Sequence, residues 1–246
     1  NVCGSTNNAQ KLTSPIIVSN TDIVNILDNN IDGIRKSDGA GSNVLSAIQM
    51  ENSSNYNIKR NVINNLVTLF DQAASGISIK GQDLNGVISE NKISNVRRTV
   101  QGGNIIAGIN IESTNTNSKL VIANNFISTI SNIGHNEYSP GAYGLYINGK
   151  DIKIYHNTIL MNASFVGISA AAHFENGTGF DVQNNVFVNS NSTAGVQRLA
   201  IYSKVQESSF TSINSNDYFA PKIGYLGGER TSLNDWKAAT GKDQNS

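Results

Sequence analysis

The chain has 246 residues, of which 38% are hydrophobic and 15% charged, and its 18 basic and 18 acidic residues give a formal net charge of zero. No basic run stands out, so electrostatics give no reason to expect nucleic acid or an anionic membrane as a partner. No stretch of about 18 apolar residues is present, so no membrane-spanning helix is predicted. The single cysteine, Cys3, excludes an internal disulfide framework and a thiolate metal cluster.

The first 22 residues contain one apolar run, Ile16 to Val18, and are predicted to form an N-terminal cap or a partial first coil. The chain begins without Met and shows no signal peptide. We therefore expect a processed product or a module of a larger multidomain chain.

A repeated phrase runs from residue 23 to 219. It consists of an apolar residue, two variable residues, an Asn, one variable residue and another apolar residue. The shared Asn recurs at steps of 32, 30, 34, 32, 28 and 31 residues, at Asn29, Asn61, Asn91, Asn125, Asn157, Asn185 and Asn216. A period of about 30 residues is typical of stacked structural repeats.

A second phrase lies upstream of each Asn from the second onward. It starts with a small residue and then alternates, as in G-I-S-I-K, and its first residues are Ala47, Gly76, Gly108, Gly144, Gly167 and Ala200. Alternation in Ile-rich segments predicts strands and not helices. Two short strands per repeat, with nothing helical between them, predict an all-β fold, a parallel β-helix of six to seven coils.

The Asn and the charged residues support this alignment. The shared Asn is predicted to turn the chain at a corner, where its side chain tolerates left-handed backbone angles, and to stack in a hydrogen-bonded ladder. Charges alternate in sign along two further columns, one formed by Asp28, Arg60 and Glu90 and the other by Glu51, Lys80 and Glu112. Opposite charges on neighbouring strands stabilise the pairing.

The last segment, residues 220–246, is predicted to be a C-terminal cap that completes a single domain spanning 1–246. Ser232 and Asp235 have the spacing of a helix capping box, and Gly241 stands where that helix should end. Trp236 is expected to cover the last coil.

The repeats resemble those of a known superfamily. Phrases such as I-A-N-N-F-I-S, Y-H-N-T-I-L and V-Q-N-N-V-F-V-N, with the ending D-W-K-A-A-T-G-K-D-Q-N-S, are similar to right-handed parallel β-helix repeats of the pectin-lyase-like superfamily, in modules of secreted or surface proteins of Bacteroidetes. The resemblance implies the same fold and a secreted or cell-surface location. It does not choose between lyases, hydrolases, adhesins and non-catalytic modules.

A lyase would need a base and a cation that neutralises a uronate carboxylate. Arg35 with Lys36, and Arg97 with Arg98, follow a ladder Asn at equal distances and are predicted to share one loop column, with His135 and Glu137 in the next loop. The alternative is that these are solvated pairs neutralised by nearby aspartates, at positions 32, 38 and 71. The acids are scattered, so neither a metal site nor a hydrolase pair is predicted.

The second candidate is aromatic. In the alternating strand the first outward position is predicted to hold Gln49, Ser78, Asn110, Tyr146, Ser169 and Tyr202. Tyr146 and Tyr202 would then project two coils apart, roughly 10 Å, near the repeat of a β-linked disaccharide. His173 is expected in a turn and His156 beside the Asn ladder, neither of them catalytic.

These observations predict an extracellular, non-catalytic β-helix module, a surface or adhesin-like scaffold that binds a polysaccharide or cell-surface glycan on one strand face. No catalytic residue, metal or cofactor is assigned; the predicted glycan-binding residues are Tyr146, Tyr202, Arg35, Arg97 and Arg98. The alternative is a polysaccharide lyase that acts on an acidic glycan through the arginine column.

Overall fold

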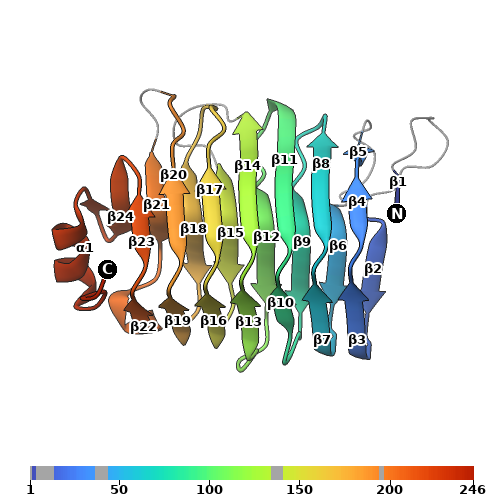
Figure 1. The fold of residues 1–246 in the computed structure, drawn as a ribbon, viewed down its shortest axis with the longest axis horizontal. Helices are drawn as coiled ribbons and strands as arrows, with labels where there is room; N and C mark the ends of the chain where they lie inside the picture. Colours follow the sequence, from blue (N-terminus) through green and yellow to red (C-terminus); the bar gives the residue numbers. More distant parts are fainter. Residues whose placement is uncertain (1, 4–13, 37–43, 134–140, 194–196) are drawn as a thin grey trace.

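The protein is a parallel β-solenoid of about six turns that ends in one short helix, as Figure 1 shows, and this confirms the predicted fold class. The computed structural model describes residues 2–3, 14–36, 44–133, 141–193 and 197–246. Each turn contributes one strand to each of three parallel sheets. The expectation of two strands per repeat was therefore wrong, because the Asn-containing phrase is divided by a corner into two strands.

The three sheets are named A, B and C. Sheet A contains β1 (Val2–Cys3), β4 (Asn30–Asp32), β8 (Val62–Thr68), β11 (Lys92–Gln101), β14 (Phe126–Ile133), β17 (Thr158–Met161), β20 (Val186–Asn189) and β23 (Asp217–Phe219), with β5 (Arg35–Lys36) also paired to β8. Sheet B contains β2 (Ile16–Ser19), β6 (Leu45–Glu51), β9 (Ala74–Gly81), β12 (Ile106–Ser113), β15 (Ala142–Asn148), β18 (Ser169–Asn176), β21 (Arg198–Ser203), β24 (Lys222–Leu226) and β25 (Glu229–Arg230). Sheet C contains β3 (Asp22–Leu27), β7 (Ser54–Lys59), β10 (Val87–Ser89), β13 (Leu120–Ala123), β16 (Ile152–Tyr155), β19 (Phe180–Gln183) and β22 (Phe210–Asn214), the last preceded by the 3-10 turn Glu207–Ser209.

The corner between sheets C and A depends on the residue before the ladder Asn. This residue has a left-handed φ of 54° to 56° in every turn, at Asp28, Arg60, Glu90, Asn124, His156, Asn184 and Ser215. The prediction that the Asn itself takes left-handed angles was therefore wrong. Arg60 and Glu90 are residue types that rarely adopt this backbone conformation. They adopt it here because the hydrogen bonds of the neighbouring ladder Asn fix the turn.

The seven shared Asn residues form one continuous ladder, as predicted. From Asn29 to Asn185, each backbone N–H and each side-chain Nδ2 donates to Oδ1 of the next Asn at 2.9 to 3.0 Å. From Asn61 onward, Nδ2 also donates to a carbonyl of the preceding turn. At the last rung, the Asn216 N–H donates to the Ser246 hydroxyl at 2.8 Å. The buried amides are thus paired along the axis.

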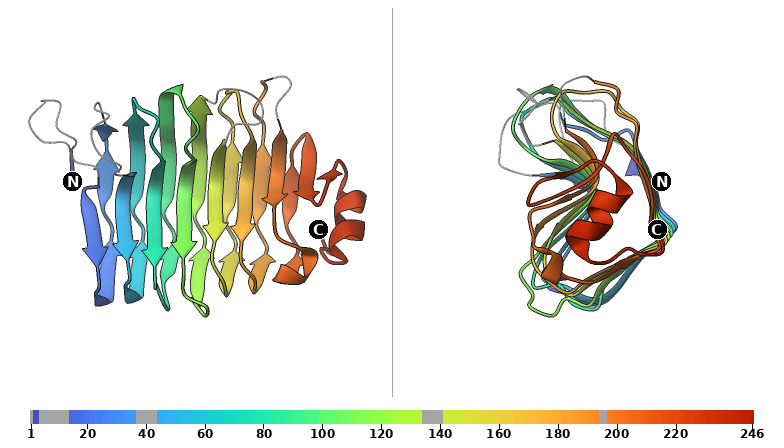
Figure 2. Two further views of the ribbon diagram at one scale, coloured as in Figure 1. Left: turned by 180° about the vertical axis from the view of Figure 1, so that it is seen from behind. Right: turned by 90° about the vertical axis from the view of Figure 1, so that its left-hand side faces the viewer.

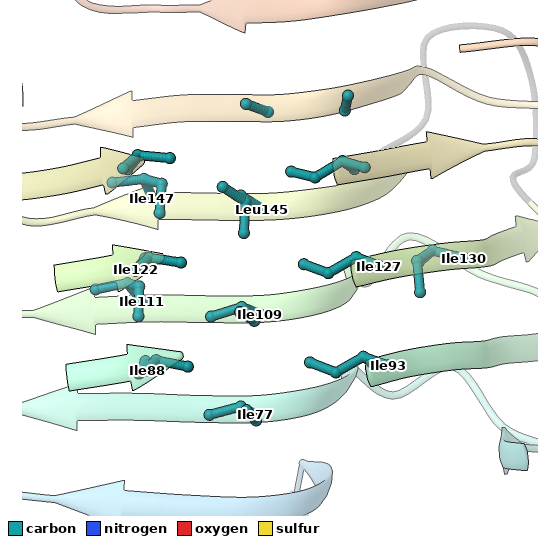
Figure 3. Packing of buried hydrophobic residues seen from close by; sticks show 14 of the residues in the cluster. Ile77, Ile88, Ile93, Ile109, Ile111, Ile122, Ile127, Ile130, Leu145 and Ile147 are labelled. Atoms are coloured by element: carbon teal, nitrogen blue, oxygen red, sulfur yellow. The ribbon is translucent and has the colours of Figure 1, made fainter. Parts of the chain in front are cut away.

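The core is a set of stacked aliphatic columns between the sheets. Figure 3 shows Ile77, Ile109 and Leu145 of sheet B facing the columns that contain Ile88 and Ile93, and all of these are fully buried. The small first residue of the predicted sheet-B phrase makes room for this packing. A Cβ at Gly144, for example, would lie 2.2 Å from Cγ2 of Ile159.

Charge alternation along the stack is confirmed by ion pairs between neighbouring turns. Arg60 pairs with Asp28 at 2.7 Å, and Lys80 lies 3.8 Å from Glu112. Glu90 pairs with Lys59, the residue before Arg60, at 2.7 Å. These pairs are largely exposed, so each adds little net stability.

The C-terminal end is closed by helix α1 (Leu233–Thr240), which lies across the end of the stack in the right-hand view of Figure 2. The predicted capping box between Ser232 and Asp235 is present, and Gly241 ends the helix with a left-handed φ of 63°. Trp236 is fully buried, and its Nε1 donates to Asp243 at 2.9 Å. Hydrophobic cover and hydrogen bonding together close the core at this end.

Candidate functional site

Aromatic residues gather on the outward face of sheet B. One register column contains Gln49, Ser78, Asn110, Tyr146, His173, Tyr202 and Tyr225. Tyr146 and Tyr202 therefore lie two strands apart on one face, as predicted. The residue between them is His173 and not Ser169, so the expectation that His173 occupies a turn was wrong.

The error has a physical cause in the sixth turn. Both G-I-S-A-A at Gly167 and A-A-H-F-E at Ala171 fit the pattern of a small residue followed by alternation. The structure uses the second phrase, pairing Leu145 with Ala172 and Tyr146 with His173. This register places the side chain of Phe174 in the core, where it is fully buried, and that burial favours the register.

The rings of this face form a contiguous group, here called the aromatic cluster: Tyr143, Tyr146, His173, Tyr202 and Tyr225. His173 is central: its ring is stacked on Tyr146 with centroids 5.0 Å apart, and it lies 4.5 Å from Tyr143 and 4.8 Å from Tyr202. Tyr202 meets Tyr225 edge-on at 5.2 Å. Such ring pairs contribute about 0.5–1.5 kcal/mol each beyond burial.

A charged pair borders the cluster. Glu175 accepts a hydrogen bond from His173 Nε2 at 2.8 Å and pairs with Lys204 Nζ at 2.9 Å. The bond from His173 lowers the pKa of Glu175 to about 2, whereas burial lowers the pKa of His173 below its usual value. At neutral pH the carboxylate is therefore charged and the imidazole neutral, with its proton on Nε2. His173 Nδ1 is left as a buried acceptor with no hydrogen-bond partner among the described residues.

A hollow of about 320 Å³, here called the aromatic groove, opens beside the cluster. It is lined by the rings of Tyr143, Tyr146, His173 and Tyr202, by Glu175 and Lys204, and by Ile105 and Ile168. Tyr146 is only 7% exposed, whereas Tyr202 is half-buried and Lys204 is exposed. A ligand in the groove would therefore contact Tyr202, Lys204 and Glu175 first.

The arginine column has a different arrangement. Arg35 and Arg97 share one register column on sheet A, on either side of Val67, and both are exposed. Arg98 is 2% exposed; its guanidinium donates to Asp71 at 2.6 Å and to the carbonyl of Gly102. Arg98 is therefore a buried, paired group, in contrast to Arg35 and Arg97.

The remaining predicted residues are either placed away from the groove or not described. His156 lies in the corner column between Asn124 and Asn184 and is exposed. His135 and Glu137 lie outside the described residues. Sequence reasoning missed Tyr143, Glu175 and Lys204 as neighbours; the phrase A-A-H-F-E, read as a strand, would have brought His173 and Glu175 into this column.

No group of three or more His, Cys, Asp or Glu side chains suited to a metal ion is found in the described part of the chain. Within the same residues, no helix is long and apolar enough to cross a membrane. Comparisons with protein-family models, with curated proteins and with solved structures found no match to this chain.

Proposed function

We propose that this protein is an extracellular, non-catalytic β-solenoid scaffold that binds a glycan in the aromatic groove. The observation that carries the proposal is the half-buried ring of Tyr202 beside the Glu175–Lys204 pair, at the edge of a hollow. A flat ring packs against the C–H face of a pyranose, and a neighbouring acceptor and donor bind its hydroxyls.

The groove is rigid as well as aromatic. Tyr146 and His173 are held by ring contacts on paired strands, and Glu175 is held from both sides by His173 and Lys204. Binding groups that are already fixed lose little entropy when a ligand arrives. A stack of parallel strands therefore suits a scaffold that presents a preformed site.

The proposed location is secreted or cell-surface. Its support is the low content of charged residues, 15%, and the resemblance of the repeats to the pectin-lyase-like superfamily.

A glycan array followed by calorimetry tests the proposal. We expect at least one glycan class to bind, and Tyr202→Ala to reduce the affinity by about fivefold or more, since an aromatic contact is worth on the order of 1 kcal/mol. Tyr155→Ala is the matched control, because Tyr155 is a half-buried tyrosine on sheet C, outside the groove. No binding by the intact protein, or equal losses in both variants, would exclude the groove as a glycan site.

A polysaccharide lyase is the second candidate, and the shared column of exposed Arg35 and Arg97 is the observation that favours it. The assay is incubation with alginate, pectate and glycosaminoglycans, with absorbance read at the unsaturated-uronate band. Product that is lost in Arg97→Ala would establish this activity and overturn the non-catalytic proposal.

A further inference from the structure

A second hollow lies next to the aromatic groove on the same face of sheet B. It has a volume of about 220 Å³ and is lined by residues of β9 and β12, among them Ser75, Ala107 and Asn110. Ile105 lines both hollows. The two spaces are thus neighbours along the axis of the solenoid, and the small side chains Ser75 and Ala107 leave the second one open.

Asn110 gives the second hollow its polar character. It belongs to the same register column as Tyr146 and His173, two strands before His173. Its side chain is 7% exposed, and its Oδ1 has no hydrogen-bond partner among the described residues. Buried polar atoms are nearly always paired in native proteins, so an unpaired buried acceptor on a residue that lines a hollow is a position where a ligand donor would gain a hydrogen bond.

We infer that the two hollows are successive subsites for one linear oligosaccharide that lies along the solenoid axis, with the Asn110 amide binding a hydroxyl of the unit next to those at the aromatic groove. This inference rests on the proposed glycan binding. From Asn110 on β12 to Tyr202 on β21 there are three strand steps, about 14 Å at 4.8 Å per step. A β-linked disaccharide, which is expected to match two strand steps of roughly 10 Å, is shorter than this span, so the ligand contains at least three sugar units.

The charges of the groove select neutral sugars. Among the described residues that line the two hollows, Lys204 is the one cation, and it is paired with Glu175. Glu112, which lines the second hollow, is paired with Lys80. A uronate carboxylate would meet two carboxylates and no cation that is free of an acidic partner, and like charges placed together are unfavourable.

Calorimetry with a length series of neutral β-linked gluco- and manno-oligosaccharides, from di- to hexasaccharide, and with oligouronates of the same lengths, tests the inference. We expect affinity to rise at least fivefold between the disaccharide and the tetrasaccharide. Asn110→Ala should abolish that rise and leave disaccharide affinity unchanged, whereas Tyr202→Ala should weaken every length. Ser78→Ala is the matched control, since Ser78 is a buried residue of the same column that lines neither hollow.

Each result decides a separate claim. Equal affinity for all lengths, or an equal loss for di- and tetrasaccharide in Asn110→Ala, would overturn the second subsite while glycan binding itself stands. Tighter binding of oligouronates than of neutral sugars would overturn the neutral ligand class. If no oligosaccharide of either kind binds at any length, the proposed function fails and this inference fails with it. Circular dichroism on each variant confirms that the solenoid is folded.

Discussion

Replacing one interior Asn of the ladder should lower the free energy of unfolding substantially, because its amide makes hydrogen bonds to both neighbouring turns. In Asn125, Oδ1 accepts from the backbone N–H and from Nδ2 of Asn91, both at 3.0 Å. Its Nδ2 donates to the Ile88 carbonyl and to Asn157 Oδ1, both at 2.9 Å. Asn125→Ala removes all four bonds. At a net value of about 1 kcal/mol per bond, we expect a loss of about 4 kcal/mol in the free energy of unfolding.

The first rung provides the matched control. Asn29 is half-buried, and among the described residues its Nδ2 donates to Asn61 Oδ1 and to the Leu27 carbonyl. Because water can replace these bonds, we expect Asn29→Ala to cost about 1 kcal/mol or less. The assay is urea unfolding followed by circular dichroism, with hydrogen exchange of β13 and β14 to detect local opening of the stack. Equal and small losses in both variants would refute the reasoning that the ladder stabilises the solenoid from within.

Three further predictions concern single side chains. Burial raises the pKa of Asp83 to about 6, so the folded state favours the protonated carboxyl. The stability that this provides is fully present below about pH 4 and is lost as the pH rises through 6. By pH 7 the free energy of unfolding of Asp83→Asn should therefore exceed that of the wild type by about 3 kcal/mol. A wild-type-to-variant difference that does not change with pH would contradict this. Arg98→Met should cost about 2–3 kcal/mol and exposed Arg97→Met less than about 0.5 kcal/mol, measured by urea unfolding; the reverse order would show that Arg98 is not a structural residue. Trp236→Ala should cost about 3–5 kcal/mol in thermal unfolding, because it empties the end of the core and removes the bond to Asp243; a loss below about 1 kcal/mol would mean that the helix does not close the stack.

Much of the fold could be predicted because the same physical requirement recurs in every turn. The Asn ladder and the charge columns are visible in the sequence because stacking places equivalent residues side by side. The helix at the C-terminus was predictable because Ser232, Asp235 and Gly241 carry local signals that need no tertiary context. In a repeat protein, long-range contacts can therefore be predicted from short sequence motifs.

The corners and the candidate site were harder to predict. That Arg60 and Glu90 adopt left-handed angles follows from contacts with other turns, and not from their own preferences. In the sixth turn, two sequence segments fit the strand pattern equally well. Packing against the neighbouring turns decides between them and places His173 between Tyr146 and Tyr202. A hollow forms where neighbouring turns place small side chains side by side, and the sequence of one repeat does not predict this.

Binding of a neutral glycan at the aromatic groove is the central claim, and nuclear magnetic resonance of ring-labelled tyrosines tests it most directly. On titration with a neutral β-linked tetrasaccharide, we predict that the ring signals of Tyr146 and Tyr202 shift in a saturable manner while those of Tyr155 stay in place. If the screened neutral and acidic glycans leave Tyr146 and Tyr202 unmoved, or shift only tyrosines outside the groove, the claim is contradicted.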